Sequence, residues 1–141
     1  MESTASASSA TSRTRLRVLV VDDEEAIRLM LQDGLSSVGY DVDTAANGVE
    51  ALDRFEPGRY SLVLSDLMMP TMGGWELSSR LRAVDATLPI IVLSAYAVTL
   101  EDEAARRRVF LLHKPSTLDV IVRAIGKALA RQPHPEAWIL S

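Results

Sequence analysis

The sequence predicts an α/β protein built on a doubly wound parallel sheet, and three observations support this fold class. Short apolar runs alternate five times with segments of helical periodicity. The central runs are apolar without a break, as expected for strands that helices cover on both faces. Polar residues follow several runs directly, where the loops and helix N-termini of such a sheet converge. We therefore expect five strands joined by right-handed crossovers.

Composition excludes several classes of protein. The chain has 141 residues, enough for one domain with its own core, and no cysteine for disulfides or thiolate metal sites. Its 15 Lys and Arg against 19 Asp and Glu argue against nucleic acid or an anionic membrane as a direct partner. No apolar run approaches the ~20 residues of a membrane span, and the N-terminus lacks a secretory signal. We expect a soluble, cytoplasmic protein.

One folded domain between two tails is the expected organisation. Residues 1–14 are almost wholly Ser, Thr and Ala, and cannot bury enough surface to offset the entropy of ordering them, so a disordered tail is expected. Residues 15–132 contain the alternating strands and helices. Residues 133–141 form a C-terminal tail, whose Trp138 is suited either to packing back on the domain or to anchoring a partner.

The first half of the domain contains two predicted strands and two helices. Leu16–Val21 is β-branched and apolar, which favours a buried strand. A helix follows, with apolar residues recurring from Ile27 until Gly39 closes it. Tyr40–Thr44 alternates apolar and acidic residues and suits an edge strand. A turn at Asn47-Gly48 leads into a second, shorter helix.

The second half begins with the central strand, Leu62–Asp66, which ends in a single carboxylate. Trp75–Val84 has one apolar face and predicts the third helix. Leu88–Leu93 is the fourth strand, a charged helix is expected over residues 99–108, and Val109–Leu112 is the fifth strand. The last helix shows the clearest apolar face, formed by Leu118, Ile121, Val122, Ile125 and Leu129.

Polar residues follow four of the strands, and a parallel sheet would bring them to one edge. They are Asp22 and Asp23 after the first strand, Asp66 in the third, Ser94 after the fourth and Lys114 after the fifth. Clustered carboxylates repel each other unless a cation compensates, and Mg²⁺ prefers such oxygen ligands. A lysine and a hydroxyl beside it would receive a transferring phosphoryl group, with Asp66 as nucleophile. Singly, each aspartate is also compatible with capping a turn or helix.

Together these residues resemble the motifs of response regulator receiver domains, also called CheY-like domains. The matching segments are Val20–Glu24, Asp66–Gly74, Ser94-Ala95 and Lys114-Pro115. The resemblance spans residues 16–131 and implies a flavodoxin-like fold with strand order 2-1-3-4-5. That order agrees with the site, because it makes the first and third strands neighbours and lets their carboxylates meet.

The resemblance also implies roles for the acidic residues. Asp66 would accept a phosphoryl group from a histidine kinase or a histidine phosphotransfer protein. Mg²⁺ would be bound by Asp23, Asp66 and the backbone carbonyl of Met68, while Asp22 would act largely through metal-bound water.

The remaining implied roles complete a signalling switch. Ser94 would hydrogen-bond the phosphoryl oxygens, Lys114 would pair with them, and the peptide bond between Lys114 and Pro115 would be cis. The implied function is that of a single-domain response regulator in a phosphorelay, which docks to a downstream protein target. Such a protein is no enzyme, apart from accepting its own phosphoryl group and hydrolysing it.

Two other functions use parts of the same pattern. An aspartate-nucleophile phosphohydrolase of the haloacid dehalogenase type also uses Asp, Ser or Thr, Lys and Mg²⁺. It needs a second Asp two residues after the nucleophile, however, where this chain has Met68. A docking module that is never phosphorylated would not need the full set of site residues.

The region around the fifth strand departs from the family pattern. The interval between the site serine and the site lysine is shorter than usual, which predicts a trimmed fourth helix. Arg106–Arg108 replace the usual Gly-Ala and are compatible with a solvated helix end or with a partner-binding patch. The position of the usual switch aromatic is Leu111, with Phe110 one residue earlier. We therefore predict that Tyr96 responds to phosphorylation while Phe110 stays packed.

Overall fold

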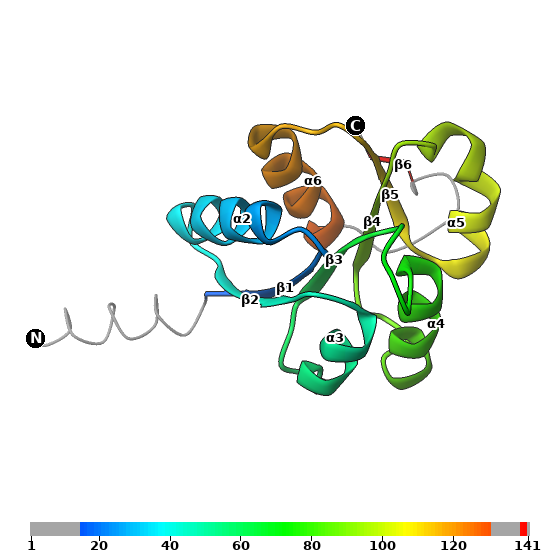
Figure 1. Ribbon diagram of the computed structural model, residues 1–141, viewed down its shortest axis with the longest axis horizontal. Coiled ribbons are helices and arrows are strands. Elements are labelled where there is room, and N and C mark those ends of the chain that lie inside the picture. Colours follow the sequence, from blue (N-terminus) through cyan, green and yellow to red (C-terminus); the bar gives the residue numbers. More distant parts are fainter. Residues whose placement is uncertain (1–14, 131–138, 141) are drawn as a thin grey trace, which may run out of the picture.

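A parallel sheet forms the middle layer of the structure, with helices on both of its faces (Figure 1). The computed structural model describes residues 15–130 and 139–140. The strands lie in the order β2-β1-β3-β4-β5-β6, and each neighbouring pair is parallel. Their bounds are β1 Arg17–Val21, β2 Asp41–Ala45, β3 Leu62–Asp66, β4 Ile90–Ser94, β5 Phe110–His113 and β6 Ile139–Leu140. The predicted fold class and the order 2-1-3-4-5 are confirmed.

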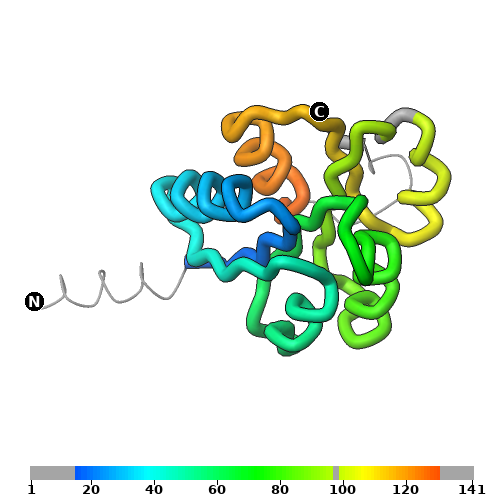
Figure 2. Tube along the Cα trace, in the orientation of Figure 1, coloured from blue at the N-terminus to red at the C-terminus, as the bar shows by residue number. Residues whose placement is uncertain are grey.

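Helices fill the crossovers between the strands. They are α2 Glu25–Ser37, α3 Gly48–Arg54, α4 Gly74–Val84, the 3₁₀ helix η1 Ala97–Leu100, α5 Glu101–Arg107 and α6 Leu118–Ala130. In Figure 2, α2 and α6 lie together on one side of the sheet, and α3, α4 and α5 lie on the other. In the described part of the chain, no helix is long and apolar enough to cross a membrane.

The two central strands provide the middle of the core. Every residue of β3 and β4 is buried, as expected from their unbroken apolar sequences. From one face of the sheet the core continues into α2 through Leu31 and Leu35, and into α6 through Ile121 and Ile125. Both faces of β3 and β4 are therefore closed to solvent, and only the strand ends reach the surface.

Two predicted elements have different boundaries in the structure. The fourth strand begins at Ile90 rather than Leu88, since Pro89 has no N–H to donate to the ladder. The helix predicted over residues 99–108 is divided into η1 and α5. It ends before Arg108, which adopts a left-handed conformation with a φ of 57°.

β6 lies in the segment that the sequence predicts to be a C-terminal tail. It extends the sheet by pairing Ile139 with Leu111 and Leu140 with Leu112. Trp138 and the predicted disordered residues 1–14 lie outside the described residues. Ile139–Leu140 therefore add a sixth strand beside β5, where the sequence predicts five strands.

Candidate functional site

Five of the six predicted site residues lie together at the carboxyl edge of the sheet. Asp22 and Asp23 follow β1, Asp66 ends β3, Ser94 ends β4 and Lys114 follows β5. Because β1 pairs with β3, the carboxylates of the two strands meet, and oxygens of Asp22, Asp23 and Asp66 lie within 4.8 Å of one another. The strand order thus assembles a charged site from segments far apart in the sequence.

Asp66 is the carboxylate at the centre of this site. Its residue is only 5% exposed, with β1 on one side of its strand and β4 on the other. Lys114 Nζ lies 2.9 Å from Asp66 Oδ1. Burial acts to lower the pKa of Lys114, but the hydrogen bond and the attraction to Asp66 outweigh it and raise the pKa above its ordinary value. Lys114 is therefore a fixed positive charge beside Asp66.

Asp22 is buried more deeply than its neighbour Asp23, which is exposed. One oxygen of Asp22 accepts a hydrogen bond of 2.9 Å from the backbone N–H of Glu24. Burial is the main cause that raises the pKa of Asp22, and repulsion by Asp66 and Asp23 adds to it. Three carboxylates against one ammonium leave excess negative charge, and oxygen ligands of this kind suit a hard divalent cation such as Mg²⁺.

Ser94 connects the site to the loop after β4. Its residue is buried, and its Oγ accepts a hydrogen bond of 2.9 Å from the backbone N–H of Tyr96. The backbone carbonyl of Ser94 also accepts a hydrogen bond of 2.9 Å from the N–H of Lys114. The peptide bond between Lys114 and Pro115 is cis, as the resemblance implies. The Ser94 hydroxyl still has a proton to donate, because a hydroxyl can donate and accept at once.

Two glycines hold the loop after β3 against the site, and the sequence motif does not explain why they are needed. An added Cβ on Gly74 would lie 2.7 Å from the backbone oxygen of Asp66, and one on Gly73 would lie 2.9 Å from that of Leu67. The same loop carries Met68, a residue that is 73% exposed. The glycines therefore let the N-terminus of α4 approach the strand that carries Asp66.

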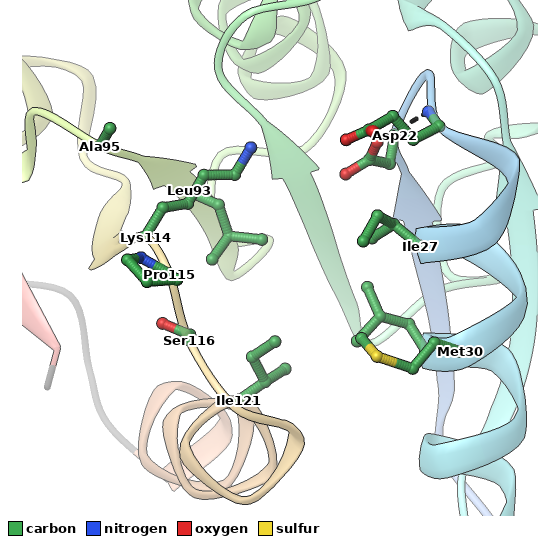
Figure 3. A pocket seen from close by; sticks show the side chains of 11 residues that line it. Asp22, Ile27, Met30, Leu93, Ala95, Lys114, Pro115, Ser116 and Ile121 are labelled. Carbon is green, nitrogen blue, oxygen red and sulfur yellow. Dashed lines mark hydrogen bonds between the residues drawn. The ribbon is translucent and has the colours of Figure 1, made fainter.

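A cavity of about 330 Å³ opens beside the charged residues, between α2 and α6 (Figure 3). At its rim, the ammonium of Lys114 points toward Asp22 from the opposite side. Below the rim its walls are apolar, with Ile27 and Met30 from α2 facing Ile121 from α6. The charged site thus has a hydrophobic surface directly beside it.

Comparison with known proteins identifies the family. Residues 18–126 match the model of the response regulator receiver domain. The chain belongs to this family of phosphoryl-accepting signalling modules.

Individual relatives agree with the family match. The sensor protein EvgS of Escherichia coli K12 is 40% identical over 109 residues, which are 76% of this chain and 9% of EvgS. The chemotaxis response regulator CheY4 of Vibrio cholerae superposes with a TM-score of 0.74 at 29% identity, covering 82% of this chain and 99% of CheY4. The response regulator TrrA of Thermotoga maritima, solved in complex with Mg²⁺ and BeF, superposes with a TM-score of 0.71 at 36% identity. The match covers 80% of this chain and 98% of TrrA.

Proposed function

We propose that this protein is a phosphorylation switch in which Asp66 accepts a phosphoryl group from a phosphohistidine of a histidine kinase or phosphotransfer protein. An oxygen of Asp66 would attack the phosphorus, the bond from phosphorus to the histidine nitrogen would break, and the imidazole would leave. The observation that carries this proposal is the buried Asp66 carboxylate, with Lys114 at 2.9 Å and two further carboxylates beside it.

The other site residues would bind and orient the phosphoryl group. Lys114, held protonated by its acidic neighbours, would pair with a phosphoryl oxygen. Ser94 would donate its hydroxyl proton to another oxygen while it continues to accept from Tyr96. These contacts favour the negative charge that collects on the transferring group.

The acidic cluster also fits a divalent cation. Asp23, Asp66 and the carbonyl of Met68 would bind Mg²⁺, with Asp22 acting through metal-bound water. When bound, Mg²⁺ would neutralise charge on the phosphoryl oxygens. Support comes from the oxygens of Asp22, Asp23 and Asp66, which lie within 4.8 Å of one another, and from TrrA, which was solved with Mg²⁺ and BeF.

The proposed output is docking to a downstream protein, followed by hydrolysis of the phosphoryl group by the domain itself. Membership of the receiver family favours this switch over the phosphohydrolase alternative. Met68 also stands where that enzyme class needs its second aspartate.

Phosphorylation with a small donor tests the acceptor. Incubation with acetyl phosphate and Mg²⁺ should add the mass of one phosphoryl group to the intact protein, and hydroxylamine should remove it, as expected for an acyl phosphate. Asp66→Asn should abolish the added mass. Asp53→Asn, a matched change on the exposed surface of α3, should leave it unchanged. Undiminished labelling of Asp66→Asn would show that the acceptor is another residue.

A further inference from the structure

A second charged site lies at the edge of the sheet opposite to Asp66. It is a hollow of about 360 Å³ between the carboxyl-terminal ends of α4 and α5, which lie side by side in Figures 1 and 2. Its lining residues are Ser79, Arg82, Ala83, Arg106, Arg107 and Arg108. Four of the 15 basic residues of a chain with a net charge of −4 therefore meet in one place.

Two of these arginines are fixed by the scaffold. Arg107 donates to the carbonyl of Trp75 at 3.2 Å and to Ser79 Oγ at 2.7 Å, and its guanidinium lies 5.2 Å from the centroid of the Trp75 ring. Arg82 donates to the backbone carbonyls of Leu88 and Arg108, each at 2.6 Å. These contacts join α4 to the end of α5, and the guanidinium groups are held in place before any ligand arrives.

The positive charge of the hollow is only partly neutralised. Glu103 pairs with Arg106 and Arg107, but neither Arg82 nor Arg108 has a carboxylate in ion-pair contact among the described residues. Burial, with repulsion by Arg108, lowers the pKa of Arg82. The Nε of Arg82 is buried and has no hydrogen-bond partner within the described part of the chain. Four arginines against the single carboxylate of Glu103 leave excess positive charge in the hollow, which favours a nearby anion.

Arg108 ends α5 in a left-handed conformation, and its side chain is exposed. Its φ of 57° lies in the left-handed region, which glycine or asparagine adopts at lower cost after a helix. The side chain is exposed and forms no hydrogen bond or ion pair with the described residues. The backbone is that of a helix C-cap, in which the N–H of Arg108 donates to the carbonyl of Ala105 and the N–H of Val109 to that of Ala104, so the exposed guanidinium of Arg108 remains available to a ligand.

We propose that the hollow formed by Arg82, Arg106 and Arg108 binds the phosphate group of a small phosphorylated molecule. Guanidinium groups bind phosphate oxygens through paired N–H donors, so several of them around one hollow suit a tetrahedral dianion better than a single carboxylate. This site is separate from the one at Asp66, because it lies at the other end of the strands.

Titration with inorganic pyrophosphate in metal-free buffer tests this proposal. In heteronuclear NMR spectra, the amides of residues 79–83 and 106–108 should shift saturably, both in the wild type and in Lys114→Ala, which disables the site at Asp66. Arg108→Gly should weaken binding by roughly tenfold or more, yet raise the melting temperature, since it relieves the left-handed strain and the repulsion of Arg82. Arg108→Lys keeps the charge and should bind with intermediate affinity.

Arg80 provides the matched control. It lies on the exposed part of α4, pairs with Glu76 and does not line the hollow, so Arg80→Gln should bind pyrophosphate as the wild type does. Equal affinity of Arg108→Gly and wild type, loss of the shifts in Lys114→Ala, or an absence of saturable shifts would each overturn the proposal. Tighter binding of a hexaglutamate peptide at the same amides would also overturn it and assign the hollow to an acidic protein segment.

Discussion

At the scale of single residues, Asp22 has the clearest electrostatic consequence. Its pKa is raised in the folded protein, so the folded state binds this proton more readily than the unfolded state does. Stability contributed by Asp22 is therefore lost as the pH rises from its ordinary pKa through the raised one. Asp22→Asn should consequently be more stable than the wild type at pH 7 without Mg²⁺, by roughly 1 kcal/mol.

Urea denaturation at several pH values measures this effect. Asparagine keeps the side-chain oxygen that accepts the hydrogen bond from the Glu24 N–H. The difference in stability between the two proteins therefore reports the negative charge of Asp22. The advantage of Asp22→Asn should shrink as the pH falls toward the ordinary pKa of aspartate, where the wild-type carboxyl is also neutral. An advantage that is the same at pH 4 and pH 7 would contradict the electrostatic explanation.

Gly74, which backbone atoms approach closely, and Gly126, which has open space around it, give a matched pair of glycine substitutions. Gly74→Ala would place its Cβ 2.7 Å from the Asp66 oxygen and 3.0 Å from the Cα of Leu67, both backbone atoms, and should destabilise the protein by about 1–3 kcal/mol. Gly126 lies in α6 with open space around an added Cβ. Gly126→Ala should stabilise the protein by about 0.5–1 kcal/mol. Thermal unfolding of both variants checks the signs, and a neutral Gly74→Ala would mean that α4 can move away.

Sequence analysis predicts well which polar residues meet at the sheet edge, and it predicts poorly the conformation of residues that depend on tertiary contacts. The carboxylates, Ser94 and Lys114 were predicted because polar residues directly follow apolar strands. The left-handed backbone at Arg108 was not predicted, because arginine rarely adopts this conformation. Only the short connection from α5 to β5 imposes it. The sequence likewise left open whether Arg106–Arg108 are solvated, whereas the structure ties Arg107 to Trp75 and Ser79.

At the scale of elements, the loop from β4 to η1 is the segment that phosphorylation should move. Ser94 Oγ accepts the N–H of Tyr96, so a Ser94 side chain drawn toward a phosphoryl group carries the Tyr96 backbone with it. Tyr96 is 68% exposed and free to reorient, whereas Phe110 is 1% exposed within β5. Beryllofluoride with Mg²⁺, a phosphoryl mimic, should therefore shift the ring resonances of Tyr96 more than those of Phe110.

Ser94→Ala supplies the control for this coupling. Without the hydroxyl, the response of Tyr96 should fall well below that of the wild type, even though the mimic still binds at Asp66. A crystal structure in which Phe110 changes rotamer while Tyr96 keeps its place would show that the signal leaves through β5 instead.

Two features of the strands show that sequence periodicity alone is insufficient to predict every strand and its boundaries. Four of the five long strands were predicted because each is an apolar run bounded by turn or charged residues, and β2 was predicted from its alternating pattern. β6 was not predicted, since a two-residue strand has no periodicity of its own. It depends on the edge of β5 for its hydrogen bonds. β5 itself begins at Phe110 rather than Val109, because its limits follow the pairing with Ile91 on β4.

At the scale of the whole molecule, the acidic cluster should couple metal binding to folding. A ligand that binds only the folded state stabilises it by about 2.7 kcal/mol at a concentration of 100 times its Kd. Millimolar Mg²⁺ should therefore raise the melting temperature, and Asp23→Ala should lose most of the rise. The control variant Asp53→Ala, on the surface of α3, should keep the rise in melting temperature. Equal rises in Asp23→Ala and wild type would place the ion elsewhere.

The fold class was predictable because it depends on the alternation of strands and helices along the sequence. The assembly of the site depends in addition on the order of the strands in the sheet. Alternating strands and helices specify a parallel sheet with covered faces, but they do not specify which strands are neighbours. The order came from the family resemblance and from the requirement that Asp22 and Asp66 meet. The structure satisfies that requirement through the direct pairing of β1 with β3.

The enclosure of β3 restricts the direction from which a donor can reach Asp66. Strands flank β3 on both sides, helices cover both of its faces, and Asp66 is 5% exposed. A phosphorus atom can then arrive only end-on, along the axis of the strand, between the loops that follow β1, β3 and β4. A slender group that projects from its own surface, such as an imidazole ring or a small free phosphate ester, fits that approach. A phosphate recessed in a broad surface does not fit this approach. The shape of the donor should therefore limit which donors react, before any specific contact forms.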